Sequence, residues 1–110
     1  MAYDEELAGR IRELAEGEPG LSEKRLFGGL AFLVAGNMAV VASAQGGIMV
    51  RVDPEQSGTL TKTTAATPAV MRGREMRGWL RLAAADVSRE DELAAWAERG
   101  IAYARSLPPK

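Results

Sequence analysis

The sequence predicts an α+β domain with two layers, in which helices pack on an antiparallel sheet of about five strands. Residues 26–50 contain no charged side chain, and turn-forming glycine and asparagine residues divide this run into pieces of strand length. Apolar residues recur at helical spacing near both ends of the chain. A length of 110 residues suits one core, so residues 1–110 are expected to form a single domain with the order α-β-β-β-α-β-β-α.

The first element is expected to be a helix over residues 4–16. Asp4 is a favourable N-cap, and the glutamates that follow it suit the positive end of the helix dipole. Gly17 and Pro19 end the helical pattern. The apolar positions at helical spacing are Tyr3, Leu7, Ile11 and Leu14.

The uncharged run that follows is long enough to suggest a membrane span, but its turns argue against one. The sequences AGN and AQGG are typical of hairpin turns, because glycine and asparagine tolerate a positive φ. We therefore expect a meander of three strands, residues 26–34, 38–43 and 48–52, and no membrane association.

Two adjacent glycines, Gly28 and Gly29, stand near the start of this run in the motif LFGGLAF. A phosphate-binding loop would need a Gly-Lys-Ser/Thr ending or a Gly-x-Gly-x-x-Gly pattern between a strand and a helix, and neither is present. Glycine within a strand is typical of a bulge or a close backbone approach. We expect Gly28, Gly29 and the turn residue Gly36 to be structural, and Phe27 to lie in the core.

After the meander, the sequence DPEQ predicts a helix capped by Asp53, with proline in its first turn. Gly58 and the threonines around it are poor helix formers, so this helix is expected to be short and frayed. Two further strands, residues 69–72 and 77–83, are expected around a Gly-Arg-Glu turn.

The last helix follows the sequence SRED, in which Ser88 is the expected cap. Its apolar stripe has the period of a helix, and Pro108 and Pro109 end it. Trp96 belongs to this stripe and is expected to be a core residue. The stripe consists of Leu93, Trp96, Ala97, Ile101 and Ala104.

The chain contains no cysteine and no histidine, which excludes disulfides, thiol nucleophiles and imidazole bases and removes the usual zinc and copper ligands. No cofactor or metal is expected. The N-terminal sequence MAYDEEL is acidic and unlike a signal peptide, so the expected location is cytoplasmic.

The formal net charge is −1, but the sign of the charge varies along the chain. Residues 1–23 and 86–98 are acidic, whereas residues 62–81 carry one lysine and four arginines against one glutamate. We expect the basic and acidic segments to neutralise each other within the fold, because charged surfaces are commonly only solvated.

An enzyme would need a nucleophile, an acid or base, and a pocket. The serines have no histidine partner, and the carboxylates cluster at helix starts, where the helix dipole accounts for them. We therefore expect no enzymatic activity. The favoured interpretation is a regulatory or protein-interaction module with an unknown protein partner, and a small-molecule sensor is an alternative.

A nucleic-acid interface is a further alternative, carried by the sequence MRGREMRGWLR. Arg72, Arg74, Arg77 and Arg81 can contact phosphates, and Trp79 can stack on a base. An isoelectric point near 5.5 is unlike that of a dedicated DNA-binding domain, and Trp79 is more simply a core residue. Nucleic-acid binding is therefore considered but not favoured.

Both faces of the predicted sheet are apolar. Simple alternation assigns Leu26 to the face of Phe32, and Met38 to the face of Val40, while the opposite face also carries apolar residues. Three helices can cover one face, so the second is expected to need a partner, and a twofold homodimer is the simplest solution. Arg51, the only charge in the strand IMVRV, is expected on this less covered face beside a carboxylate, as another candidate interaction residue.

Four motifs in order resemble the N-terminal domain of the TfoX/Sxy family of bacterial competence regulators. They are LFGGLAF at 26–32, the turn glycine Gly36, IMVRVDPE at 48–55 and ELAAWAERG at 92–100. The resemblance implies an α+β fold with helices over an antiparallel sheet, a role in regulating competence or transcription, and no catalytic residues. Full-length members also have a helical domain with helix-hairpin-helix character, which this chain is expected to lack, so no DNA-directed role of that domain is carried over.

Overall fold

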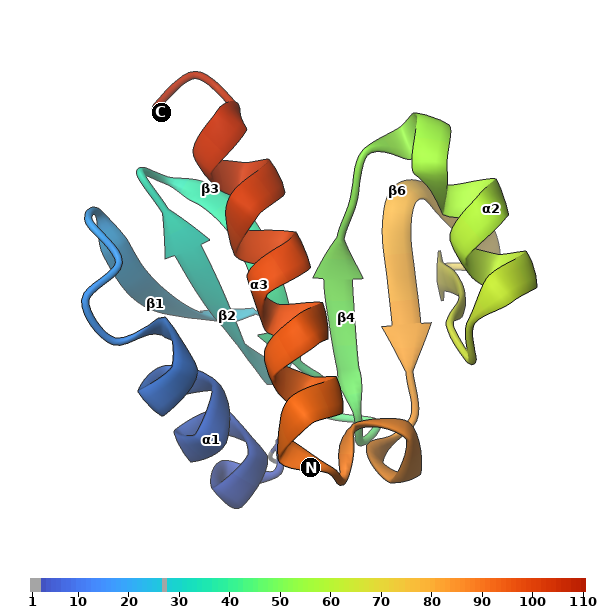
Figure 1. Cartoon of the computed structure of the whole chain (residues 1–110), viewed down its shortest axis with the longest axis horizontal. Coiled ribbons are helices and arrows are strands. Elements are labelled where there is room, and N and C mark those ends of the chain that lie inside the picture. The colour runs from blue at the N-terminus through green and yellow to red at the C-terminus, as the bar shows by residue number, and fades with distance from the viewer. Residues whose placement is uncertain (1–2, 27) are drawn as a thin grey trace.

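Three helices cover one face of a single antiparallel sheet in the computed structural model, which describes residues 3–26 and 28–110 (Figure 1). The strands lie in the order β1-β2-β3-β4-β6-β5. The predicted α+β class with two layers is confirmed. In chain order the elements are α1 (Glu5–Ala15), β1 (Leu21–Leu26), β2 (Gly29–Val34), β3 (Asn37–Ala42), β4 (Ile48–Arg51), α2 (Pro54–Thr63), β5 (Thr67–Met71), β6 (Arg74–Leu82), the 3-10 turn η1 (Ala84–Val87) and α3 (Glu90–Ser106).

The sheet has six strands within the described residues, one more than the sequence predicts. The expected strand 26–34 contains only the last residue of β1, together with all of β2. Leu26 ends β1 and pairs with Gly29 at the start of β2, so the glycine motif lies at a hairpin. Leu26 also packs on the face opposite Phe32, contrary to simple alternation. Phe27 lies outside the described residues.

The uncharged run forms strands and turns, as predicted. Gly36 and the residue before it, Ala35, have φ values of +86° and +51° and connect β2 to β3. A Cβ on Gly36 would lie 2.8 Å from the Cβ of Lys110, whose backbone N–H donates to the carbonyl oxygen of Ala35 at 2.8 Å. Within the described part of the chain, no helix has both the length and the apolar character needed to cross a bilayer.

Asp4 and Asp53 cap α1 and α2 as predicted. The Asp4 carboxylate accepts from the backbone N–H groups of Glu6 and Leu7 at 3.0 and 3.1 Å, and that of Asp53 accepts from the backbone N–H of Glu55 at 2.9 Å. The predicted cap of α3 is wrong. Arg89 is the N-cap residue, and the Ser88 hydroxyl instead donates to the carbonyl oxygen of Ala85 at 3.1 Å. Ser88 therefore closes the preceding 3-10 turn, a local bond that competes with helix capping.

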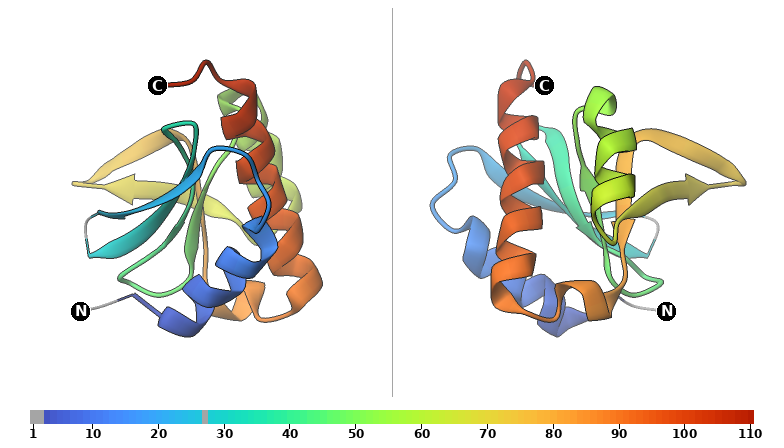
Figure 2. Two further views of the ribbon diagram at one scale, coloured as in Figure 1. Left: turned by 90° about the vertical axis from the view of Figure 1, so that its left-hand side faces the viewer. Right: turned by 45° about the vertical axis from the view of Figure 1, so that its right-hand side comes forward.

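The main core lies between the helices and the sheet. Phe32 of β2, Ile48 of β4 and Leu93 of α3 have no exposed surface, and Trp96 is 8% exposed in the same cluster, as predicted for a core residue. The helix α3 crosses β2, β3 and β4, and α2 lies against β6 (Figures 1 and 2). This arrangement places all three helices on one side.

A bulge at Ala39 reverses the predicted side-chain direction of Met38 in β3. Phe32 pairs with Val40, and the next residue of β2 pairs with Met38, so Ala39 has no partner in β2. Val40 consequently faces the helices, whereas Met38 joins Val41 on the opposite face. Simple alternation had grouped Met38 with Val40, and that assignment is wrong.

Candidate interaction face

No described element covers the face of the sheet opposite the helices (Figure 2). Its centre is a second apolar cluster, separate from the main core, in which Trp79 and Val41 are buried among partly buried neighbours. We call this surface the methionine face. It comprises Leu26, Leu33, Met38, Val41, Met49, Val70, Met71, Met76 and Trp79.

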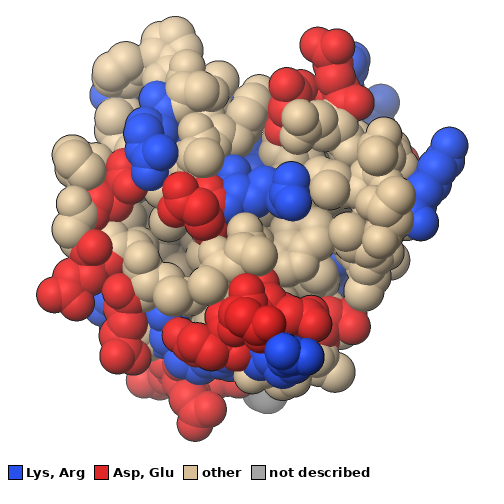
Figure 3. All heavy atoms as spheres, in the orientation of Figure 1, with Lys and Arg blue, Asp and Glu red and all other residues tan. Residues whose placement is uncertain are grey.

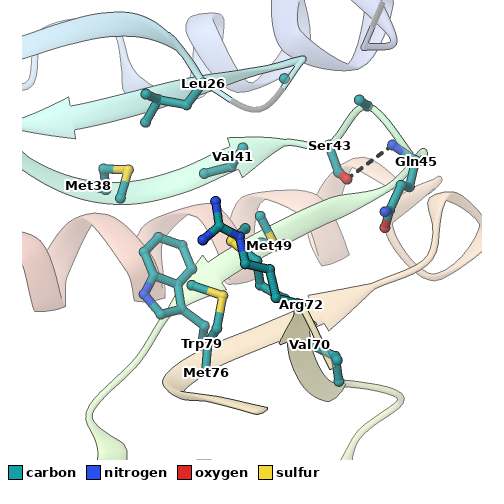
Figure 4. A pocket seen from close by; sticks show the side chains of 13 residues that line it. Leu26, Met38, Val41, Ser43, Gln45, Met49, Val70, Arg72, Met76 and Trp79 are labelled. Atoms are coloured by element: carbon teal, nitrogen blue, oxygen red, sulfur yellow. Dashed lines mark hydrogen bonds between the residues drawn. The ribbon is translucent and has the colours of Figure 1, made fainter. Parts of the chain in front are cut away.

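The methionine face is hollowed, with a cavity volume of about 220 Å³. Met38 and Met49 line the hollow from the middle of the sheet, and Met76 lines it from the hairpin of β5 and β6 (Figure 4). Met71 on the same hairpin is also a lining residue. That hairpin extends away from the helix layer, past the other strands, and so forms one wall (Figure 2). The chain has four methionines besides Met1, and all four line this one hollow.

The side chains of this face are accessible as well as apolar. The four methionines are half-buried, and Val70 on the hairpin is 59% exposed. Methionine is unbranched and polarisable, so a surface rich in it adapts to the shape of a bound apolar group. An apolar hollow of this kind is suited to binding, because monomers rarely leave large apolar patches open to water.

Arg72 is the one charged residue, among those described, that lines the hollow. It begins the two-residue turn between β5 and β6, and both Arg72 (φ +54°) and Gly73 (φ +77°) are left-handed. Figure 4 shows its side chain extending from the hairpin over the hollow. The guanidinium group is thus held above an apolar surface.

Arg81, another predicted interaction residue, is engaged within the fold. Its guanidinium group donates to the hydroxyl oxygen of Ser43 at 3.1 Å and to the carbonyl oxygens of Gln45 at 3.4 Å and Gly46 at 2.8 Å. These bonds join β6 to the turn between β3 and β4. Arg81 therefore supports one end of the methionine face.

The other predicted arginines have different surroundings. Arg74 and Arg77 are exposed on β6. The guanidinium carbon of Arg51 lies 5.9 Å from the ring centre of Tyr103 on α3, a cation–π distance. Arg51 was expected on the less covered face beside a carboxylate, but its guanidinium group lies near Tyr103 of the helix layer and forms no ion pair among the described residues. Of the five arginines, Arg72 alone lines the hollow in the part of the chain that the structure describes.

Two glutamates of the N-terminal acidic segment form ion pairs with arginines that lie outside the basic segment 62–81. The Arg12 guanidinium donates to both carboxylate oxygens of Glu23 at 2.6 and 2.9 Å, and Arg105 does the same to Glu18 at 3.0 and 2.7 Å. These hydrogen bonds lower the pKa of Glu18 and of Glu23. Within the described residues, no ion pair joins residues 62–81 to an acidic segment, so direct pairing of that basic segment is not part of the fold.

The helix side differs in charge from the hollow. Figure 3, which views the molecule from the helix side, shows carboxylates gathered over the lower part of this layer, among basic side chains. No carboxylate of the described residues lines the hollow on the other side. The methionine face is therefore apolar with a cationic edge.

Sequence reasoning did not single out the methionines. A signal was present, because each internal methionine falls within or beside a predicted strand. Their convergence depends on the bulge at Ala39 and on the projection of the β5–β6 hairpin. Neither feature follows from alternation alone.

The motif residues lie where the fold needs them. Gly28 has a left-handed φ of +77° at the turn between β1 and β2, and Gly29 is buried at the start of β2. A family model of the TfoX N-terminal domain matches residues 13–104, which is most of the chain. Comparison with curated proteins finds no match. The chain therefore belongs to the TfoX N-terminal domain family.

Proposed function

We propose that this protein is a non-enzymatic regulatory module that binds another protein through the methionine face. The observation that supports this is the hollowed apolar surface on the side of the sheet that no described helix covers. The proposed setting is the bacterial cytoplasm, as the resemblance to competence regulators implies.

The polar groups around the hollow also favour binding over catalysis. The Ser43 hydroxyl oxygen accepts hydrogen bonds from Arg81 and from the backbone N–H of Gln45, at 3.1 and 3.2 Å. It is thus an acceptor that orders the β3–β4 turn, and in the part of the chain that the structure describes no carboxylate or amine accepts a hydrogen bond from it. A nucleophile would need such a base within hydrogen-bond reach.

A second copy of the chain is one protein that can cover this face. Twofold pairing is the commonest symmetry of soluble oligomers and would bury the same apolar surface on both copies. The homodimer is the alternative occupant of this face. Sedimentation equilibrium at micromolar concentration tests it, and the mass of a single chain at every concentration would contradict it.

Site-specific photo-cross-linking in the native cell tests the proposed interaction surface. A benzophenone-bearing residue replaces the exposed Val70 on the methionine face, and a matched variant carries it at the exposed Ala102 on α3. Position 70 should give a discrete protein adduct that position 102 does not. The same adducts from both positions, or none from position 70, would contradict the proposal.

A further inference from the structure

The charges at the methionine face indicate what kind of partner it fits. We propose that the hollow binds an amphipathic helix whose apolar side is flanked by acidic residues. This inference rests on the proposed function and adds the shape and the charge of the partner.

The edges of the sheet are poorly suited to a partner that adds a strand. The edge strand β1 is charged along its centre, at Glu23, Lys24 and Arg25, and charged edges resist strand pairing. The other edge strand, β5, contains Pro68, which has no N–H to donate. A partner is therefore expected on the face and not at an edge.

The size of the hollow favours anchoring side chains of a larger partner. Sites that enclose a small molecule usually measure about 300 to 1,000 Å³, whereas this hollow measures about 220 Å³ and opens onto the wider methionine face. An amphipathic helix presents apolar side chains along one side and inserts them into such a hydrophobic groove. The methionines supply the adaptable walls that this mode of binding uses.

Cations surround the hollow, and among the described residues no carboxylate lines it. Arg72 lies over it, Lys24 shares a face with its cross-strand partner Ala31, and Arg74 is the cross-strand partner of Met71. The same register pairs Val70 with Glu75, so one carboxylate lies beside these three cations. A second copy placed face to face would bring more cations than carboxylates against these cations. A helix with acidic flanks would pair with them, so charge favours this partner over self-association.

The backbone of Arg72 gives a separate reason to assign it a binding role. The first position of a two-residue turn with positive φ favours asparagine or glycine, and arginine there is conformationally costly. Non-glycine residues with such backbone angles cluster at functional sites. Ala35 has a similar φ in the β2–β3 turn, so the backbone of Arg72 supports a binding role together with the position of its side chain over the hollow.

Nucleic acid fits the face less well than an acidic helix. Trp79 is only 9% exposed, so its ring offers little surface on which a base could stack. The middle of the face is formed by methionine, leucine and valine, which have no attraction for phosphate. The cations lie around an apolar centre and do not form a continuous track.

Fluorescence anisotropy with two labelled peptides tests the inference. Both are about 16 residues long, enough for about four helical turns, with leucine or phenylalanine at i, i+3, i+4 and i+7. One carries glutamate at the flanking positions and the other carries lysine. The glutamate peptide should bind about tenfold more tightly, with a preference that declines as salt is raised.

Arg72→Asn separates binding from stability, because asparagine suits the turn better than arginine does. This variant should melt no lower than the parent yet bind the glutamate peptide about three- to tenfold more weakly. Lys62→Gln, at an exposed position on α2, removes the same charge elsewhere and should leave binding unchanged.

Three results would overturn the acidic helix: equal or absent binding of the two peptides, unchanged binding by Arg72→Asn, or binding only of a labelled single-stranded oligonucleotide. A homodimer that closes the face to the glutamate peptide would overturn it as well. If cross-linking at position 70 gives adducts but the two peptides bind equally, only the proposed acidic helix is refuted, and the proposed function stands. Failure to form those adducts would refute the proposed function itself.

Discussion

The carbonyl oxygen of Ala42 lies 2.5 Å from the position that a Cβ of Gly29 would occupy. The second glycine of the LFGGLAF motif is therefore required by the close approach of β3 to β2. Gly29 thus serves the close backbone approach that the sequence predicted.

Gly29→Ala should destabilise the protein by about 1 to 3 kcal/mol, because the backbone of β3 must shift to admit the methyl group. Gly58→Ala is the matched control, since a Cβ there meets no atom within 4 Å and α2 gains a better helix former. It should stabilise by about 0.5 to 1 kcal/mol. Urea unfolding measures both changes, and equal effects of the two variants would contradict the close approach.

Trp96→Ala should cost about 3 to 5 kcal/mol, since the indole is packed in the main core at 8% exposure. Thermal unfolding measures the loss. A variant that melts within about two degrees of the parent would show that the side chain contributes little to the core. The sequence predicts the same loss of stability for Phe27→Ala, and this stays a prediction because Phe27 lies outside the described residues.

Arg81→Met should destabilise by about 1 to 3 kcal/mol, because the Ser43 hydroxyl and the carbonyl oxygens of Gln45 and Gly46 lose their donor. Arg77→Met, at an exposed position on the same strand, should stay within about 0.5 kcal/mol of the parent. Chemical denaturation of the pair decides whether Arg81 is structural. Identical midpoints for the two variants would show that it is not.

Stability should decline in acid as Glu18 and Glu23 are protonated. Hydrogen bonds from Arg105 and Arg12 lower the pKa of these carboxyl groups in the folded protein below the ordinary value of 4.5. Their stabilising contribution is therefore complete above pH 4.5 and is lost as the pH falls through the folded pKa values.

The double variant Glu18→Gln, Glu23→Gln should melt below the parent at neutral pH and approach it in acid. Melting temperatures of the variant and the parent, measured between pH 7 and pH 3, test whether the difference between them shrinks as the pH falls. A difference between variant and parent that grows as the pH falls would contradict it.

The elements whose apolar pattern matches their burial could be predicted from the sequence. α1 and α3 have apolar stripes, and the glycine turns delimit β2, β3 and β4. β1 could not be found in this way, because the sequence LSEKRL is exposed along its centre and shows no alternation. Its strand conformation comes from pairing with β2, a tertiary effect that outweighs local preference.

The candidate site was predictable only in part. The expectation of an uncovered apolar face followed from apolar residues at both sets of alternating positions, but the side-chain directions in β3 depended on the Ala39 bulge. The sequence places four arginines in residues 62–81, yet among the described residues only Arg72 of these four lines the hollow. Sequence position does not show that Arg81 is hydrogen-bonded within the fold.

The central claim is that the methionine face is the surface through which this protein acts. The most direct measurement is the NMR spectrum of protein labelled at methionine and alanine methyl groups, recorded alone and in an extract of the native cell. The account predicts that the signals of Met38, Met49, Met71 and Met76 shift or broaden together, while that of Ala102 on α3 stays in place. Unchanged methionine signals, or changes confined to the helix side, would contradict it.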